Sequence, residues 1–554
     1  MKKLSTLLKK FRIKLIALLA IAFMITAAGV ADNYFEVSKN LEIFTGLYRE
    51  LNIYYVDETQ PGELMKTGID AMLKSLDPYT VYYPESKIED FRFMTTGQYG
   101  GIGALIHSDN GVIVISDPYE GYAAQKIGLR AGDIIEEVDG KSVTGKTQEE
   151  ISEVLKGQAG TIVELGVKRF GTLEKLKFSV TREEVKIPDV PYYGMLDEKV
   201  GYIKLNGFTK TASSDVRNAF KDLKDNSGMT ELVFDLRGNG GGLLREAVNI
   251  VNFFVPKGTE IVSTRGKLEE WNRTHEALNE PLDLDIPLVV LIDGSSASAS
   301  EIVSGALQDL DRAVVIGETS FGKGLVQQTK DISYNTKLKL TVAKYYIPSG
   351  RCIQKLDYSH RSFQGRVEEV PDSLIMPFYT SNGRPVFDGR GIKPDKEVEF
   401  EGVANILNGL LQNNVLFDYA TVFRSKVDSV DAAKIFVMND SQYDDFVQYA
   451  LTQEFSYDTQ TEKLFKELER VAKDERYMAG AENDFSALYE KIQPRKEEDL
   501  RKFRAEIQEF LENEIIGRFY FQTGRYEYSL TRDLYIDQAV ATFGADYNQT
   551  LAKQ

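Results

Sequence analysis

The 554-residue chain lacks several features that would point to particular classes of protein. Its single cysteine, Cys352, excludes an intramolecular disulfide. It has only three histidines, His107, His275 and His360, and none lies in a glycine-rich turn, so a Ser–His–Asp arrangement is poorly supported. It also lacks an excess of basic residues. The net charge of −17 argues against a nucleic-acid partner, because binding phosphates requires a basic surface.

The scarcity of cysteine does not by itself fix the compartment, since a large exported domain does not require disulfides. Catalysis by Cys352 is not favoured, because this residue lies in a turn after a strand-like run. A chain of this length is too long for one ordinary core, so we expect two to four domains.

The first 31 residues carry the clearest compartment signal. The segment Leu15–Ala31 is free of charge and ends in small residues, and it follows a basic start made of Lys2, Lys3, Lys9, Lys10, Arg12 and Lys14. This pattern predicts a signal peptide or an N-terminal membrane anchor. Either alternative exports the rest of the chain, so we expect it in the periplasm or anchored to the inner membrane facing the periplasm. A buried helix of a cytosolic protein fits the lysine cluster badly.

Helical periodicity follows this segment. Apolar residues at helical spacing predict helices over Phe35–Leu51 and Pro61–Ser75, the second ended by Pro78. A glycine-rich segment, Gly97–Gly103, then leads into a region of short strands joined at the turn Asp109-Asn110-Gly111. We expect strands at Ala104–His107, Val112–Ile115, Ile162–Lys168 and Leu176–Thr181. One helix is expected between the second and third strands, at Thr147–Leu155.

From Val200 onward, strands alternate with glycine turns and helices, which indicates an α/β layer structure. The expected strands are Val200–Lys204, Glu231–Leu236, Pro287–Ile292 and Ala313–Ile316. Beyond about Glu401, strands become rare, and charged stretches such as Tyr457–Arg476 and Glu497–Glu514 have helical spacing. They predict a helical C-terminal domain whose role the sequence does not reveal.

Two strand-to-helix turns carry the candidate chemistry. The run Arg237–Gly242 is rich in glycine and can present backbone amides to a ligand, although it could equally be a tight turn without one. The run Asp293–Ser300 contains four serines, and a hydroxyl at a helix N-terminus lies where negative charge on an attacked carbonyl is stabilised. These serines could also be helix caps, and Ser300 with Glu301 resembles one.

A serine nucleophile needs a base, and Lys323 is the candidate. A lysine base must be neutral, which requires surroundings away from carboxylates, and the residues after Glu318 are small, apolar or uncharged. The alternative is that Lys323 is an ordinary surface lysine in a loop, without a catalytic role. The run Gly317–Lys323 also matches the first seven positions of a phosphate-binding loop. However, the eighth is Gly324 instead of Ser or Thr, and Leu325–Ile332 is typical of a strand rather than a helix.

These residues resemble the C-terminal processing, or tail-specific, proteases. The resemblance rests on Ser-Ala-Ser-Ala-Ser-Glu-Ile at Ser296–Ile302 and Phe-Gly-Lys-Gly-x-Val-Gln-Gln at Phe321–Gln328, and it covers roughly Leu64–Phe400. It implies Ser298 as nucleophile and Lys323 as base. It also implies that Gln327 holds the lysine and that the amides of Gly242 and Ala299 form the oxyanion hole.

The same resemblance implies an α/β multidomain protein in which a PDZ-like domain is inserted beside a crotonase-like ββα protease core. The amides of Tyr99-Gly100-Gly101-Ile102-Gly103 would hold a substrate's terminal carboxylate. The expected divisions are a signal peptide or membrane anchor at 1–31, a helical region at 32–96, the PDZ-like domain at 97–185, the Ser–Lys core at 186–400 and a helical domain at 401–554. No metal or organic cofactor is required. The expected partners are the C-terminal tails of proteins or peptides. Contact of the N-terminal segment with a membrane and assembly into a homo-oligomer are both left open. A non-catalytic PDZ scaffold that recruits tails is the alternative.

Overall fold

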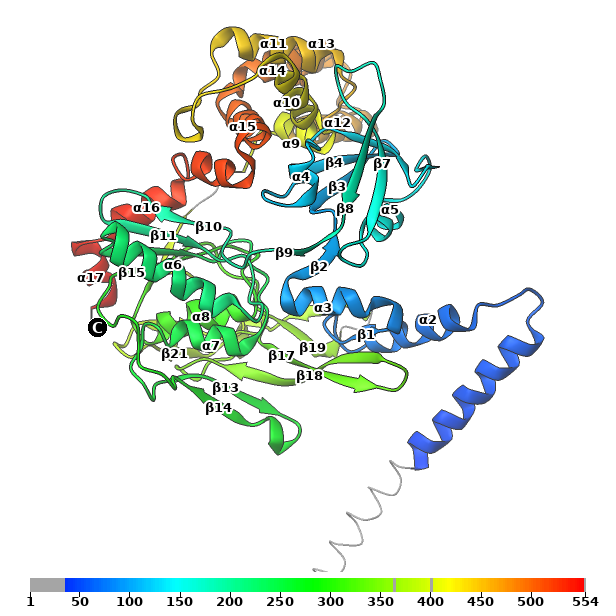
Figure 1. Cartoon of the computed structure of the whole chain (residues 1–554). Coiled ribbons are helices and arrows are strands. Elements are labelled where there is room, and N and C mark those ends of the chain that lie inside the picture. The colour runs from blue at the N-terminus through cyan, green and yellow to red at the C-terminus, as the bar shows by residue number, and fades with distance from the viewer. Residues whose placement is uncertain (1–34, 362–364, 399–401, 553–554) are drawn as a thin grey trace, which may run out of the picture. The chain divides into compact units, whose positions relative to one another are not determined.

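The computed structural model of the chain describes residues 35–361, 365–398 and 402–552 (Figure 1). It contains two compact units. The first consists of the N-terminal part up to Tyr82 with residues 329–332 and 336–340, and the second comprises the rest of the chain.

Residues 35–74 of the first unit are mainly helical, as the sequence predicts. A helix covers residues 35–54, and α2 (Pro61–Lys74) begins with a proline at its first position. The predicted signal or anchor segment, residues 1–31, lies outside the described residues. Among the described helices, none is long and apolar enough to cross a membrane.

The PDZ-like region is a small sheet domain in the second unit. After β1 (Val81–Tyr83) and α3 (Ile88–Thr96), β2 (Gln98–Gly101) pairs with β9 (Glu183–Lys186). The main sheet has the order β3-β4-β5-β7-β8, with β6 (Lys141–Ser142) beside β5. Its other elements are β3 (Ala104–Asp109), β4 (Val112–Pro118), α4 (Ala123–Lys126), β5 (Ile134–Val138), α5 (Gln148–Leu155), β7 (Ile162–Lys168) and β8 (Leu176–Thr181). The hairpin predicted at Asn110-Gly111 is present, and both residues have positive φ.

The α/β core is a six-stranded sheet of order β10-β11-β12-β15-β16-β23. In this sheet, β11, β12, β15, β16 and β23 run parallel to one another, and β10 is antiparallel to β11. The strands are β10 (Tyr192–Met195), β11 (Val200–Lys204), β12 (Glu231–Asp235), β15 (Leu288–Ile292), β16 (Val314–Gly317) and β23 (Lys396–Glu397). One face packs against α6 (Ala212–Ser227), α7 (Leu244–Val251) and α8 (Ala299–Asp309). The predicted alternation of strands and helices is therefore confirmed.

A second sheet stands beside this core. In it, β13 (Glu260–Gly266) pairs with β14 (Arg273–Glu276) and with the C-terminal end of β18 (Thr336–Tyr346). Strand β17 (Leu325–Ile332) follows the predicted lysine segment directly, as the sequence indicated. Two short hairpins, β19 (Leu356–Arg361) with β20 (Val367–Glu369) and β21 (Pro377–Tyr379) with β22 (Pro385–Phe387), complete this part.

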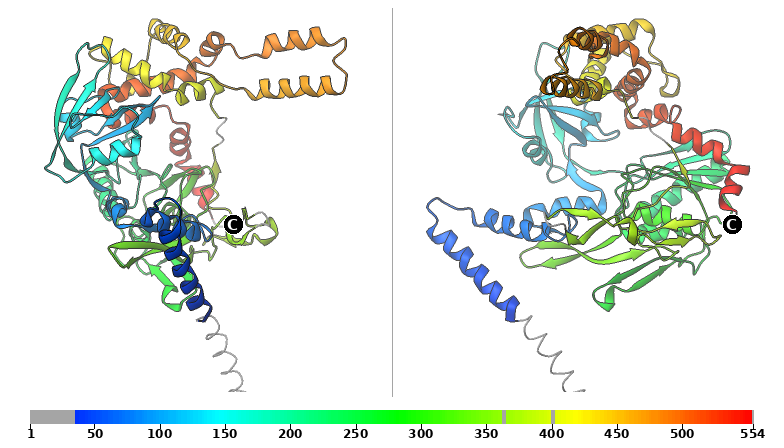
Figure 2. Two further views of the ribbon diagram at one scale, coloured as in Figure 1. Left: turned by 90° about the vertical axis from the view of Figure 1, so that its right-hand side faces the viewer. Right: turned by 180° about the vertical axis from the view of Figure 1, so that it is seen from behind.

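The C-terminal part contains a helical domain with its own apolar core. Its helices are α9 (Asn405–Gln412), α10 (Val415–Lys426), α11 (Asp440–Thr452), α12 (Gln460–Asp474), α13 (Glu482–Ile492), α14 (Lys496–Lys502) and α15 (Arg504–Ser529). Helices α12 and α13 form an extended hairpin, orange in Figure 2. The last helices, α16 (Leu534–Thr542) and α17 (Ala545–Leu551), instead pack on the other face of the core sheet, which the prediction of one helical domain over 401–554 did not anticipate.

Candidate active site

Ser298 lies where the turn after β15 enters α8. Its φ of 56° and ψ of −109° are unusual for a residue with a side chain, and such strained backbones concentrate at functional sites. Ser298 is partly exposed, whereas the side chains of Ala297 and Ala299 on either side are buried. The turn therefore presents the Ser298 hydroxyl at the N-terminus of a buried helix.

The carboxylate of Glu301 joins this serine turn to the lysine segment. Its Oε2 accepts hydrogen bonds from Ser298 N at 2.7 Å and Lys323 N at 2.9 Å. Its Oε1 accepts from Gly322 N and Ser320 Oγ, both at 2.6 Å. Glu301 is completely buried, which raises its pKa to about 7 even though all four donors favour the ionised form. One carboxylate thus fixes the backbone of both candidate catalytic residues.

Tyr345, on β18, makes a second link between the same two residues. Its buried hydroxyl lies 2.6 Å from the carbonyl oxygen of Lys323 and 3.1 Å from that of Ser298. Because Ser298 and Lys323 share a partner at both their amide and carbonyl groups, they lie beside each other although 25 positions apart. Both side chains are partly exposed.

The glycine run contacts the serine turn closely. A methyl group added to Gly241 would lie 2.7 Å from Ala297 O and 2.9 Å from Ser298 Cβ, so only glycine fits there. The next residue, Gly242, is held by a bridge to Phe208. Within the described part of the chain, no protein acceptor receives a hydrogen bond from the amides of Gly242 or Ala299. These two amides can therefore donate to a ligand.

The other candidate residues are placed as follows. Gln327 lies on β17, and its Nε2 donates to Thr341 Oγ1 at 3.3 Å. Glu318 is exposed, and its Oε1 accepts a hydrogen bond from Tyr535. The strand that begins at Leu325 rules out the phosphate-binding loop, which must open a helix.

None of the three histidines makes a hydrogen bond to Ser298 in the described residues; they lie on β3, β14 and β19. Burial raises the pKa of the Cys352 thiol, which makes this residue a poor nucleophile.

The PDZ-like region has a groove of about 230 Å³ between β3 and α5, lined by Tyr99, Ile102, Ile106, Leu155 and further residues. Strand β3 is the edge of its sheet, so its free side faces this groove. Gly100 and Gly101 differ from the prediction of an open loop, because they pair with β9 opposite Glu184 and Glu183.

The loop proper is formed by Ile102 and Gly103. In the described residues, neither of their amides donates to a protein acceptor.

Sequence reasoning missed Glu301 and Tyr345 as parts of the site. The first had a local signal, because Ser298-Ala-Ser-Glu301 has the spacing of a capping box. The sequence pattern favours Ser300 as the cap, whereas the Ser300 hydroxyl donates to Asn239 O at 2.8 Å. Tyr345 had no local signal, since it reaches the site from a different sheet.

Comparison with known proteins identifies the family. A model of peptidase family S41 matches residues 199–359, a PDZ-domain model matches 114–169, and a model described as probable PDZ-protease, C-terminal helical domain, matches 406–543. A carboxy-terminal-processing protease of Bartonella bacilliformis is 38% identical over 341 residues, which is 61% of this chain and 77% of that protein.

Two further proteins are similar to this chain. A probable CtpA-like serine protease of Staphylococcus aureus strain RF122 is 37% identical over 57% of this chain and 62% of its own length. The solved structure of a photosystem II D1 C-terminal processing protease is 28% identical, covers 67% of this chain and 95% of its own, and has a TM-score of 0.35. The chain therefore belongs to the carboxy-terminal-processing proteases of peptidase family S41, and it is a serine peptidase with a PDZ domain and a helical C-terminal domain.

Proposed function

We propose that the chain hydrolyses peptide bonds near protein C-termini through a Ser298–Lys323 dyad. Neutral Lys323 takes the hydroxyl proton of Ser298, whose oxygen attacks the scissile carbonyl. The amides of Gly242 and Ala299 stabilise the oxyanion, and the lysine then gives its proton to the leaving amine. Water, deprotonated by the same lysine, attacks the acyl-enzyme, and the lysine gives this proton to the oxygen of Ser298 as the second product leaves. Gln327 supports the position of the lysine.

The observation that carries this proposal is the shared carboxylate of Glu301. One of its oxygens accepts hydrogen bonds from the amides of both Ser298 and Lys323, which supports the two residues acting together at the N-terminus of α8. A non-catalytic protein that only recruited tails through its PDZ domain would not need this arrangement. The two unused amides beside Ser298 agree with an oxyanion hole.

We propose that the PDZ domain captures the substrate's tail. The amides of Ile102 and Gly103 would bind the terminal carboxylate, with Tyr99, Gly100 and Gly101 shaping the loop. The free edge of β3 would pair with the peptide, and the groove of about 230 Å³ would take an apolar last side chain.

The remaining parts of the proposal rest on the sequence pattern. The segment 1–31 would export the chain to the periplasm, either cleaved or as an inner-membrane anchor. Two strand–turn–helix units, β12 with α7 and β15 with α8, support a crotonase-like core over 186–400, beside the PDZ domain at 97–185.

The test uses cleavage of a peptide and labelling by a serine-trapping phosphonate. Ser298→Ala and Lys323→Ala should each abolish both signals without unfolding the protein. Ser295→Ala, in the same turn and exposed, and Lys344→Ala, an exposed lysine on β18, are the matched controls and should keep them. Near-normal turnover by Lys323→Ala would disprove the dyad, and no labelling of the native chain would favour the scaffold.

A further inference from the structure

The end of the helical domain continues into the protease core. After α15, the chain enters α16, which is red in Figure 2. Its Ile536 and Ala539 pack with Val233 and Val289 on one face of the core sheet. The 14 residues from Gln522 to Tyr535, which we call the strut, connect the two parts. At its C-terminal end, the strut makes polar contacts with the two loops that build the candidate active site, through Asp533 and Tyr535.

The first contact holds the oxyanion loop. Asp533 forms a bidentate ion pair with Arg237, with Nη1–Oδ1 at 3.1 Å and Nη2–Oδ2 at 2.7 Å. Arg237 opens the loop that ends at Gly242. Asp533 is itself fixed, because its Oδ1 also accepts a hydrogen bond from Tyr535 N at the start of α16.

Charge balance explains why Asp533 matters for Arg237. The buried carboxylate of Asp235 accepts from Arg237 Nη2 at 2.6 Å and lies 3.3 Å from Lys204 Nζ. Two cations therefore surround one buried anion, and Asp533 supplies the second negative charge. Without it, the guanidinium would face an excess of positive charge in a poorly hydrated place.

The second contact holds the loop from Glu318 to Lys323, which we call the lysine loop. The hydroxyl of Tyr535 donates to Glu318 Oε1 at 2.7 Å, two residues before Ser320, whose hydroxyl binds Glu301. The ring of Tyr535 also lies under the guanidinium of Arg237, 4.9 Å away. One turn of the strut therefore touches both loops.

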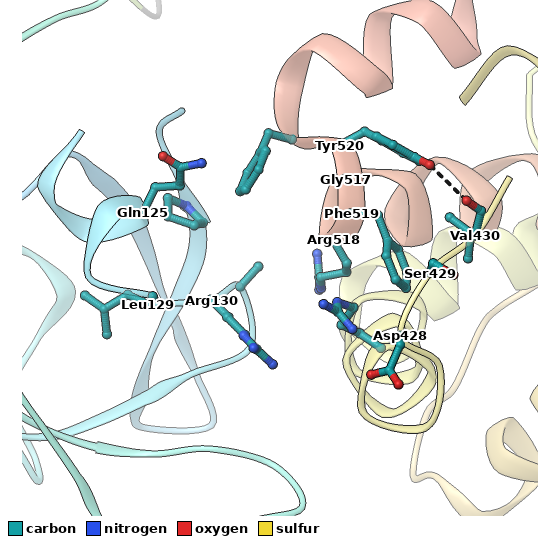
Figure 3. A pocket seen from close by; sticks show the side chains of 15 residues that line it. Gln125, Leu129, Arg130, Asp428, Ser429, Val430, Gly517, Arg518, Phe519 and Tyr520 are labelled. Atoms are coloured by element: carbon teal, nitrogen blue, oxygen red, sulfur yellow. Dashed lines mark hydrogen bonds between the residues drawn. The ribbon is translucent and has the colours of Figure 1, made fainter. Parts of the chain in front are cut away.

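The opposite end of the strut contacts the PDZ domain. Gln522 donates to Asp117 at the end of β4, and Thr523 Oγ1 donates to Glu120 at 3.2 Å. The strut begins just after Phe521, whose φ of 54° and ψ of −153° interrupt α15. A cavity of about 390 Å³ lies at this joint, with Gln125 and Arg130 of the PDZ domain on one wall and Phe519 and Tyr520 of α15 on the other (Figure 3).

We propose that the strut is a positioning element of the active site, with Asp533 as a positioning residue that sets the oxyanion loop through Arg237. The core end is fixed by a bidentate ion pair. The PDZ end is bonded to Asp117 and Glu120 through Gln522 and Thr523, so the strut links the position of the PDZ domain to that of the oxyanion loop. This inference rests on the proposed function, because it assigns the oxyanion hole to Gly242 and Ala299.

The test compares Asp533→Asn with Asp533→Glu and a matched control, Asp537→Asn, an exposed aspartate one turn later on α16. The full chain is assayed with a short chromogenic peptide and with a serine-trapping phosphonate, whose addition also needs the oxyanion hole. For Asp533→Asn we expect kcat and the labelling rate constant per site to fall about ten- to hundred-fold with KM little changed. Asp533→Glu should restore part of this loss, and Asp537→Asn should behave as wild type.

The labelling rate separates positioning from mere stability. A variant that is only less stable labels fewer sites, but each labelled site reacts at the wild-type rate. A wild-type rate per site in Asp533→Asn would overturn the inference, whereas failure of Ser298→Ala to abolish labelling would overturn the proposed function instead. If Asp533→Asn does not fold, Tyr535→Phe, which loses only the bond to Glu318, must lower the same rate constant.

The PDZ end has its own test. Gln522→Ala with Thr523→Val should lower the same rate constant per site, in the same direction as Asp533→Asn. An unchanged rate in this double variant would show that the strut does not transmit the position of the PDZ domain.

Discussion

Replacing Glu301 by glutamine tests whether one carboxylate positions both catalytic residues. The four donors need two acceptor oxygens, and glutamine keeps only one. If the amide nitrogen takes the place of Oε2, the amides of Ser298 and Lys323 both lose their acceptor. If it takes the place of Oε1, Gly322 N and Ser320 Oγ lose theirs.

The size of the effect follows from these losses. Each buried donor left unpaired costs about 1–3 kcal/mol, so the two together cost about 2–6 kcal/mol. The backbone can recover this energy only by moving the serine turn or the lysine loop. A displacement of about 1 Å lowers the rate roughly a hundred-fold, so we expect kcat to fall by at least about that factor with little change in KM.

The assay is peptide hydrolysis, with kcat normalised to the number of sites that react with a phosphonate. Asp309→Asn is the matched control, because Asp309 is also a buried carboxylate and accepts from Ser349 N at 3.0 Å and Arg351 Nη2 at 2.8 Å, at the opposite end of α8 from Ser298. It should lower stability and leave kcat per site near wild type. A wild-type kcat per site in Glu301→Gln would refute the reasoning.

Further predictions concern pH, the glycine loop, tail binding and topology. Burial raises the pKa of Glu301 to about 7, so its contribution to stability is fully present below pH 4.5 and is lost as pH rises through 7. Urea unfolding of the core should show this slope, and Glu301→Gln should remove it; an equal slope in both would contradict the assignment. Gly241→Ala should lower kcat about a hundred-fold or more, because the methyl group meets Ser298 and Ala297 O, whereas Gly240→Ala has open space and should be nearly silent. In the full-length Ser298→Ala chain, amidating the C-terminus of an apolar-ended peptide should weaken its binding roughly ten-fold or more, and N-terminal acetylation should not; equal affinities would rule out tail capture. A reporter fused after residue 398 should be active only outside the cytoplasm, and protection of the chain inside the cytoplasm would rule out export.

Much of the fold could be predicted because its patterns are local. The hairpin at Asn110-Gly111 requires two positive φ values, which asparagine and glycine supply. The continuous apolar run at Leu288–Ile292 predicts a strand covered on both faces, and this strand is fully buried. The dense small residues around Ser298 likewise predict a tight strand-to-helix turn.

The rest depends on contacts between distant parts of the chain, which local patterns do not encode. Glu301 has the spacing of a capping box, but its bonds to Gly322 and Lys323 exist only once α8 and the lysine loop are packed together. Gly100 and Gly101 suggest an open loop, yet β9, more than 80 residues later, pairs with them. The ion pair of Arg237 with Asp533 likewise joins residues that are 296 positions apart in the sequence.

The position of the acylated serine tests the central claim most directly. The full chain is treated with a serine-trapping phosphonate, and the modified peptide is identified by mass spectrometry. We expect a single adduct on Ser298, which disappears in Lys323→Ala. An adduct on another serine, or undiminished labelling of Ser298 in Lys323→Ala, would contradict the account.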